Sequence, residues 1–119
     1  MKENALKLKS YEFAIRIVKL SQYLQTERKE FVLSKQILRS GTAVGALIRE
    51  AEYGQSKTDF IHKLTTSLKE ANETEYWISI LKDTGYIEYK LYESIWNDCK
   101  ELLRLLITSI KTAKQNNEK

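Results

Sequence analysis

The residues best suited to catalysis or metal binding are few in this chain and lie apart from one another. His62 is the single histidine, and with Asp59 it forms an Asp-x-x-His pair that would share one face of a helix. A di-iron carboxylate site in a helical bundle needs two Glu-x-x-His pairs and two further carboxylates, all directed into the core. The chain offers one pair at most, and its neighbours Phe60 and Ile61 are better suited to face inward. We therefore expect His62 to be exposed or half-buried, and we predict no metal site.

The cysteine and the closely spaced glycines also lack the partners that chemistry would need. No second cysteine or histidine completes a catalytic or metal-binding arrangement around Cys99. Its spacing from Ile95 and Leu102 instead predicts a small core residue. Gly41 and Gly45 are not followed by Lys-Ser or Lys-Thr, so they do not form a phosphate-binding loop. No catalytic residue or cofactor site is predicted, and we expect a protein that is not an enzyme.

Charge in this chain is spread out rather than concentrated. The formal net charge is +4, from 20 Lys and Arg against 16 Asp and Glu, and this mild excess permits nucleic-acid binding without demanding it. Residues 100–119 hold five basic and two acidic groups. A phosphate-binding surface and an ordinary soluble surface both fit that excess, and charge alone favours the ordinary surface. The candidate nucleic-acid contacts are Lys100, Arg104, Lys111 and Lys114.

Two further clusters have a functional and a structural interpretation. The carboxylates between Glu70 and Glu75 fit a solvated or ion-paired helix face better than acid–base machinery. Tyr86, Tyr89 and Tyr92 could stack nucleic-acid bases, or they could form a subunit contact, where tyrosine is enriched. We favour the subunit contact.

Long helices are the elements that must position these residues. The chain has no proline among its 119 residues, which suits uninterrupted helices because proline removes a hydrogen bond from a helix interior. Ser56 and Asp59 resemble a capping box at a helix start, and Gly85 suits a left-handed position after the helix end. The apolar periodicity predicts helices over residues 10–26, 31–53, 57–84 and 88–112, between a flexible tail over 1–9 and a polar tail over 114–119.

Short connections between long helices favour antiparallel neighbours, so the expected fold is all-α, an antiparallel up-down-up-down four-helix bundle. Folding the second helix back on the third places Arg39 opposite Glu70 or Glu73. Folding the third helix on the fourth pairs Trp77 with Trp96. These contacts are expectations of simple hairpin geometry.

Two glycines one helical turn apart, Gly41 and Gly45, fall inside the second predicted helix. Each costs up to about 1 kcal/mol relative to alanine in a helix interior. We expect the third helix to approach closely there, with the glycines opposite residues 65–69. The alternative is a break in the helix, but the apolar register continues through both glycines.

Three separated segments carry a resemblance to a known family. They are Gln36–Ala46 with Ile48, Glu50 and Ala51; Ser56–Lys57 with Asp59–Ile61; and Glu70–Trp77 leading to Gly85–Ile87. On these segments the chain resembles, over residues 10–113, the bacterial four-helix bundle proteins related to those encoded within intervening sequences of 23S rRNA genes. Leu47 departs from the pattern, since relatives commonly carry Asn there, which argues against a polar role for this position. The structural signature that we predict is Arg39, Gly41, Gly45, Glu50, Glu70, Glu73, Trp77 and Trp96.

The resemblance implies a closed bundle, ring-like homo-oligomers with pentamers as the expected form, and no established enzymatic activity. A distantly similar bundle, the accessory subunit of diversity-generating retroelements, forms a basic pentameric barrel that works with a reverse transcriptase and nucleic acid. By that analogy, RNA or DNA binding is the leading function. The alternatives are a protein-interaction scaffold with no nucleic-acid role and, third, a metal-dependent enzyme.

The expected location is the cytoplasm. No apolar run approaches the roughly 18 residues that a membrane-spanning helix needs. A single cysteine also fits a reducing compartment. We therefore expect no membrane partner.

Overall fold

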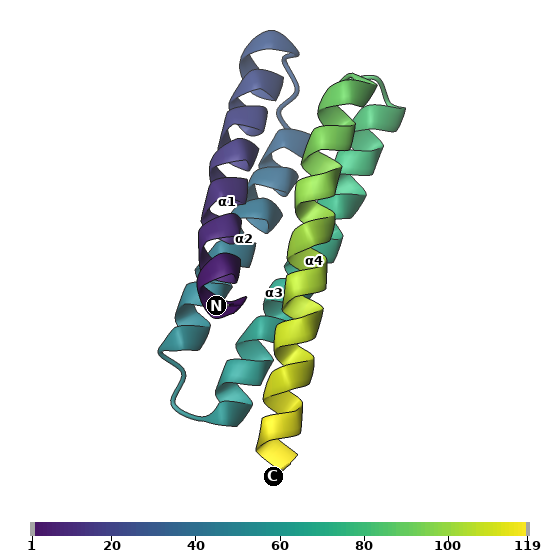
Figure 1. The fold of residues 1–119 in the computed structure, drawn as a ribbon. Helices are drawn as coiled ribbons and strands as arrows, with labels where there is room; N and C mark the ends of the chain where they lie inside the picture. Colours follow the sequence, from purple (N-terminus) through teal and green to yellow (C-terminus); the bar gives the residue numbers. More distant parts are fainter. Residues whose placement is uncertain (1, 119) are drawn as a thin grey trace.

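Four long helices form one elongated bundle (Figure 1). The structure is a computed structural model that describes residues 2–118, and the side chains of residues 5–116. The helices are α1 (Lys2–Glu27), α2 (Leu33–Glu52), α3 (Lys57–Asp83) and α4 (Tyr89–Glu118). The bundle measures 51 × 22 × 20 Å. Consecutive helices run in opposite directions, so the predicted all-α, up-down-up-down fold is confirmed.

One apolar core fills the space between the four helices. Its most deeply buried large side chains are Phe13, Ile17 and Leu24 on α1, Ile37 and Val44 on α2, Leu64, Ile78 and Leu81 on α3, and Ile95, Leu102 and Leu106 on α4. Together with the other buried residues of each helix, they follow the three- and four-residue steps that the periodicity predicts. None of the helices in the described part of the chain is long and apolar enough to cross a membrane.

The first helix begins earlier than the sequence predicts. Helix α1 starts at Lys2 rather than at Ser10, so the expected tail over residues 1–9 is wrong where the structure describes it. Leu6 is 2% exposed and extends the inner stripe of α1 by one step before Ser10. Lys7 Nζ lies 3.0 Å from a carboxylate oxygen of Glu52 on α2. Burial of one leucine together with this ion pair explains why a segment that is polar on average continues the helix.

The last helix also runs further than predicted. Helix α4 continues to Glu118 instead of ending near residue 112. Ala113 is 5% exposed and belongs to the buried set, whereas Lys114 and Gln115 face solvent. The amphipathic pattern therefore extends into the segment that we predicted to be a polar tail.

A buried carboxylate organises the connection between α1 and α2. Lys29 adopts a left-handed conformation with φ of 54°. This turn brings Glu30, which is 8% exposed, to the start of α2. Glu30 accepts hydrogen bonds from the backbone N–H groups of Val32, Leu33 and Ser34 at 3.1, 2.9 and 2.7 Å. Burial opposes ionisation of this carboxyl, but the three N–H donors outweigh burial and lower its pKa below the ordinary value of 4.5.

The predicted signals at both ends of α3 are confirmed. Ser56 precedes the helix in an extended conformation, and its hydroxyl accepts a hydrogen bond from the backbone N–H of Asp59 at 3.0 Å. Gly85 follows the helix with φ of +81°, a conformation that residues with a Cβ rarely adopt.

The two glycines of α2 face α1, so the partner that we predicted for them is wrong. A Cβ atom on Gly41 would lie 2.7 Å from Ile17 Cγ2, and one on Gly45 would lie 3.3 Å from the backbone oxygen of Ser10. The register between α2 and α3 is nevertheless as predicted, because Ser67 donates to the backbone oxygen of Val44 at 2.8 Å. Counting residues outward from the turn between two helices predicts how far along the bundle a residue lies. It does not predict the side of its helix on which the residue lies. The helix is unbroken through both glycines, so the alternative of a helix break is wrong.

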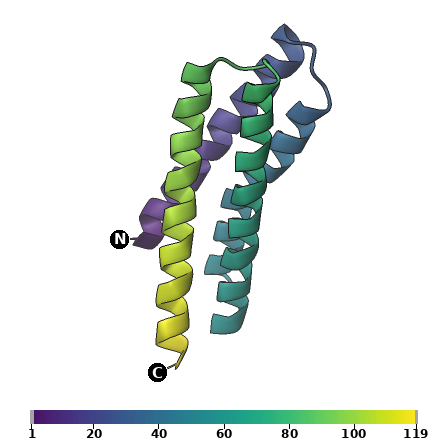
Figure 2. The ribbon, with the colours of Figure 1, turned by 90° about the vertical axis from the view of Figure 1, so that its right-hand side faces the viewer.

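The helices do not pack equally closely against one another. Helix α1 packs extensively along α2, whereas its contact with α4 is the least extensive of the four helix pairs that touch. Figure 2 shows α1 inclined to α4. One hollow between α1 and α4 is lined mainly by charged side chains, among them Arg16, Asp98 and Glu101. The two sides of α4 therefore have different surroundings.

Candidate nucleic-acid interface

The four basic candidates of α4 share one side of the helix. Lys100, Arg104, Lys111 and Lys114 recur at three-, four- and seven-residue steps, which places them in one row. Lys100 is half-buried and the other three are exposed. The row is about 21 Å long at 1.5 Å per residue. We call these four residues, together with Ile107 between them, the basic face of α4.

Most of the basic face has no carboxylate against it. Lys100 Nζ lies 3.3 Å from Glu75 on α3, and 5.3 Å from the ring centroid of Trp96. None of the ion pairs among the described side chains includes Arg104, Lys111 or Lys114. These three cations are therefore available to an external anion.

A hollow lies beside the basic face, between α3 and α4. Leu68 on α3 and Ile107, Ile110, Lys111 and Lys114 on α4 line it, and its volume is about 340 Å³. Ile107 is 53% exposed. Apolar walls edged by lysines can accept the flat, uncharged part of a ligand while the lysines hold its charge.

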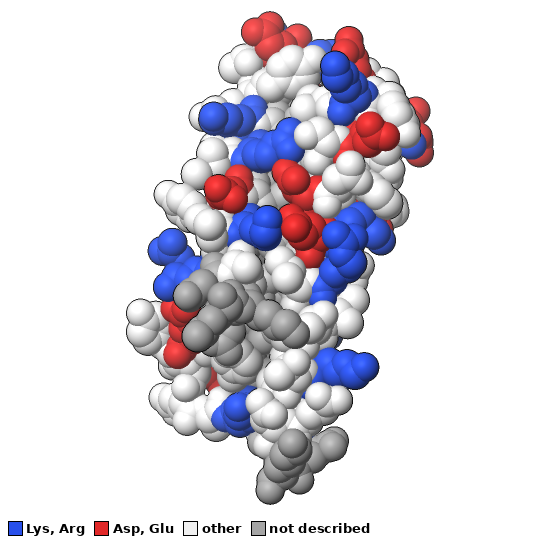
Figure 3. Space-filling view, viewed as in Figure 1, with Lys and Arg blue, Asp and Glu red and all other residues white. Residues whose placement is uncertain are grey.

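Two carboxylates of α4, Asp98 and Glu101, lie on its side toward α1, and basic residues of α1 neutralise them. Arg16 donates to Asp98 at 2.7 Å and to the hydroxyl of Ser94 at 3.0 Å. Lys9 Nζ lies 3.2 Å from Glu101. Figure 3 shows the resulting mixture of basic and acidic side chains across the face that α1 and α4 share. Counting charges along the sequence therefore does not reveal that the charged residues on the two sides of α4 differ in their pairing.

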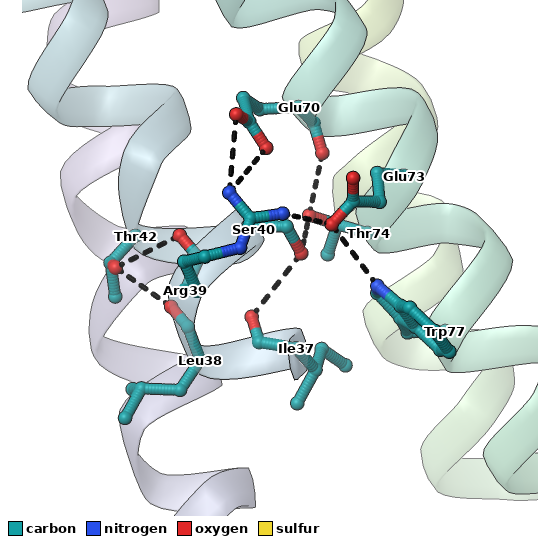
Figure 4. Close-up of polar contacts among 9 residues, drawn as sticks. All are labelled: Ile37, Leu38, Arg39, Ser40, Thr42, Glu70, Glu73, Thr74 and Trp77. Atoms are coloured by element: carbon teal, nitrogen blue, oxygen red, sulfur yellow. Dashed lines mark hydrogen bonds and ion pairs between the residues drawn. The ribbon is translucent and has the colours of Figure 1, made fainter. Parts of the chain in front are cut away.

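The predicted ion pair between α2 and α3 is confirmed. One guanidinium nitrogen of Arg39 lies 3.3 Å from Glu70, and another donates to Glu73 (Figure 4). The indole N–H of Trp77 donates to the same Glu73 oxygen at 3.2 Å. Hydrogen bonding to Glu70, although desolvation opposes it, raises the pKa of Arg39 above its ordinary value. These carboxylates are paired within the chain, which supports a structural role for them.

The remaining signature residues divide between helix pairs. Glu50 on α2 pairs with Lys63 on α3 at 3.2 Å, in the same register as the Arg39 contacts. The predicted pairing of Trp77 with Trp96 is not among the ring contacts of the described residues. Trp77 instead contacts Tyr76 with ring centroids 5.2 Å apart, and Trp96 contacts Tyr92 at 6.4 Å.

His62 and Cys99 lie where the sequence suggests. His62 is exposed, and within the described residues no group of three metal-ligating side chains exists. Cys99 is fully buried, and its thiol donates to the backbone oxygen of Ala71 at 3.4 Å. Burial raises the pKa of this thiol to about 12, so the reactive thiolate is suppressed at neutral pH.

The tyrosine cluster predicted at the α3–α4 turn is divided in two. Tyr86 turns toward the α1–α2 connection, where Arg28 donates to its backbone oxygen at 2.9 Å and lies over its ring. Tyr89 and Tyr92 continue along α4 toward Trp96, with centroids 5.9 Å apart for the tyrosine pair. Trp96 belongs to this aromatic series, which sequence reasoning missed because it grouped the tyrosines by sequence distance alone.

Sequence reasoning also missed an exposed apolar row on α1. Leu8, Tyr11, Ile15 and Val18 are 58%, 52%, 41% and 37% exposed. We call these four residues the α1 outer stripe. Their steps of three, four and three residues match a coiled-coil seam, and that spacing was visible in the sequence. It was overlooked because the inner stripe of the same helix also follows a helical period.

The chain is similar to a known protein family and to a solved structure of a protein with unknown function. A model of the family described as 23S rRNA-intervening sequence protein matches residues 2–108. A similar solved structure is the crystal structure at 1.70 Å resolution of a protein with unknown function from the S23 ribosomal protein family of Bacteroides thetaiotaomicron VPI-5482. It is 61% identical, covers 93% of this chain and 99% of its own, and has a TM-score of 0.92. No curated protein matches the chain.

Proposed function

Because the chain belongs to the 23S rRNA-intervening sequence protein family, we propose that it is a non-enzymatic, homo-oligomeric bundle protein that binds RNA or DNA through α4. The basic face of α4 carries this proposal. Arg104, Lys111 and Lys114 are exposed, lie in one row and have no carboxylate partner among the described side chains. A row of unpaired cations matches the regularly spaced phosphates of a nucleic acid.

The α1 outer stripe supports the homo-oligomeric part of the proposal. A row of four partly exposed apolar side chains on a single helix is a typical surface for helix–helix association between subunits. The guanidinium group of Arg49 on α2 lies 5.3 Å from the ring centroid of Tyr11 and borders this row. By resemblance to the family we expect a ring of five copies. Such a ring would multiply the charge of each basic face.

Salt-dependent binding tests the proposal. We expect an intact oligomer to bind RNA or DNA and to lose affinity steeply between about 50 and 200 mM salt, because released counterions drive phosphate binding. The Lys111→Glu, Lys114→Glu double variant should bind far more weakly. The matched control is Lys19→Glu, Lys35→Glu, which changes net charge equally at exposed lysines on α1 and α2. Equal loss of affinity in both variants, or no binding of any RNA or DNA by the wild type, would contradict the proposal.

A protein-interaction scaffold is the second candidate. The mixed charges of the α1–α4 face favour it, because alternating signs repel a polyanion locally while suiting a protein partner. The α1 outer stripe would then serve the partner instead of a second copy. Light scattering discriminates between the two roles of the stripe. A stable monomer would favour the scaffold and remove the ring.

The proposed location is the cytoplasm, and no enzymatic step is part of the proposed function. The single thiol, Cys99, is buried and bonded within the core, as suits a protein that needs no disulfide. The carboxylates of the signature are held in ion pairs. Both observations support a structural use of groups that could otherwise do chemistry.

A further inference from the structure

We infer that α4 carries a track for single-stranded nucleic acid, an inference that rests on the function proposed above and specifies its ligand. The track has two parts along one helix. Tyr89, Tyr92 and Trp96 form the aromatic part, and the basic face of α4 follows it. Bases stack on the aromatic part, and the phosphates of the adjoining nucleotides lie on the basic face.

The three aromatic rings form a continuous series. The ring centroids of Tyr89 and Tyr92 are 5.9 Å apart, and those of Tyr92 and Trp96 are 6.4 Å apart, with planes inclined by 44° and 36°. Tyr89 is 64% exposed, while Tyr92 and Trp96 are half-buried. Packing on one side holds the half-buried rings, and their other sides remain accessible. Partly exposed rings in a row are the platform on which unpaired bases stack, since every base has a π-face.

Two lysines lie against these rings. Lys82 of α3 has its Nζ atom 4.3 Å from the ring centroid of Tyr92. Lys100 has its Nζ atom 5.3 Å from the ring centroid of Trp96. Exposed contacts of this kind are weak, so a stacking base can displace either ammonium group. A displaced lysine stays close enough to pair with the phosphate of the same nucleotide.

The aromatic part leads directly into the basic face. Trp96, Lys100 and Arg104 follow one another at four-residue steps, which keeps them on the same side of α4. The distance along the helix from Tyr89 to Lys114 is about 38 Å at 1.5 Å per residue. A strand lying along the helix can therefore contact rings at one end and, at the other, cations that have no carboxylate partner among the described side chains.

Charge balance at the aromatic end favours a single strand over a duplex. Lys82 lies 3.3 Å from Asp83, and Lys100 lies 3.3 Å from Glu75. The hydroxyl of Tyr89 contacts Glu93 at 3.4 Å. Since cations at this end are offset by carboxylates, attraction there must come from stacking. Base faces are free in a single strand and are already stacked in a duplex.

The test compares labelled single strands and a duplex by fluorescence anisotropy, using oligouridine and oligodeoxythymidine of about 12 nucleotides and a duplex of equal length. We expect the wild type to prefer the single strands. Tyr89→Ala and Trp96→Leu should each lower single-strand affinity about five- to tenfold and leave duplex affinity unchanged. Tyr53→Ala is the matched control, since Tyr53 is 83% exposed and lies on the α2–α3 turn. The uridine and thymidine arms show whether the RNA or the DNA strand binds more tightly.

Tryptophan fluorescence gives a second reading that leaves the three aromatic residues of the track unchanged. In the Trp77→Phe variant, Trp96 is the remaining tryptophan, and its emission should be quenched when a single strand binds. Undisturbed emission at saturating oligonucleotide would overturn the stacking inference.

The outcomes separate this inference from the proposed function. If the aromatic variants bind single strands as the wild type does, while Lys111→Glu, Lys114→Glu weakens binding, stacking is wrong and the proposed function stands. If no nucleic acid binds, the proposed function fails and the track fails with it. If an aromatic variant changes the mass in light scattering but not the affinity, these rings form a subunit contact, and the inference is overturned.

Discussion

The charged side chains on the two sides of α4 differ in whether they are paired within the chain. On the side toward α1, Asp98 and Glu101 are held by Arg16 and Lys9 within the chain. On the basic face, Lys100 pairs with Glu75, whereas Arg104, Lys111 and Lys114 have no carboxylate partner among the described side chains. Charged side chains that face α1 form ion pairs within the chain and contribute to stability. The cations of the basic face that have no such partner can bind an external anion. Substitutions on the two sides should therefore change different measurements.

The largest expected effect is on binding. Replacing Arg104, Lys111 and Lys114 together by glutamine should lower nucleic-acid affinity about a hundredfold at low salt, because three phosphate contacts and their counterion release are lost. The free energy of unfolding should change by less than about 0.5 kcal/mol, as for other exposed positions. Anisotropy and urea denaturation on the same sample measure the two quantities. A large loss of stability would show that these residues belong to the fold rather than to a binding surface.

A buried charge should give the reverse result. Glu30→Gln should lower the free energy of unfolding by about 1 kcal/mol at neutral pH, because the carboxylate caps the start of α2. Since folding lowers the pKa of Glu30, its stabilising contribution is full above the ordinary value of 4.5 and is lost as the pH falls through the lowered value. The difference between variant and wild type should narrow in acid. A difference that is constant with pH would contradict the cap.

The ion pair between α2 and α3 should respond to exchange of its charges. Arg39→Glu should cost about 0.5 to 1 kcal/mol of unfolding free energy, because the pair is partly exposed and Glu70 and Glu73 would then repel the new carboxylate. Combining it with Glu70→Arg should restore most of that loss. A double variant no more stable than the single ones would argue against the contact.

The smallest effect should come from the paired side of α4. Asp98→Asn removes one ion pair whose side chains are 35% and 45% exposed, so unfolding should become easier by a few tenths of a kcal/mol. Nucleic-acid affinity should not fall. A clear loss of affinity would place a binding surface on the α1 side and end the distinction between the two sides.

The sequence predicted the position of contacts along the helices better than the direction of side chains around each helix. Arg39, Glu70 and Glu73 were paired correctly because short turns leave little freedom in the height of one helix against the next. The partner of Gly41 was predicted wrongly, and Trp77 and Trp96 make no ring contact among the described residues, because direction around each helix depends on how side chains of all four helices pack.

Other features needed the three-dimensional structure. The cap formed by Glu30 depends on the left-handed turn at Lys29, which no glycine or asparagine marks in the sequence. The early start of α1 depends on burial of Leu6, an effect that the polar average of its segment concealed. The candidate nucleic-acid residues were named from a local charge count. The reason to prefer them, their separation from the paired side of α4, became visible only when α1 was in place.

The most direct test of that separation is lysine footprinting with mass spectrometry, in which each lysine is modified in the free oligomer and in its complex with a single-stranded oligonucleotide. Lys100, Lys111 and Lys114 should lose reactivity on binding, while Lys9 on the α1 side and Lys35 on α2 should not change. Protection of Lys9 with no protection of Lys111 and Lys114 would contradict the assignment of the basic face of α4 as the binding surface.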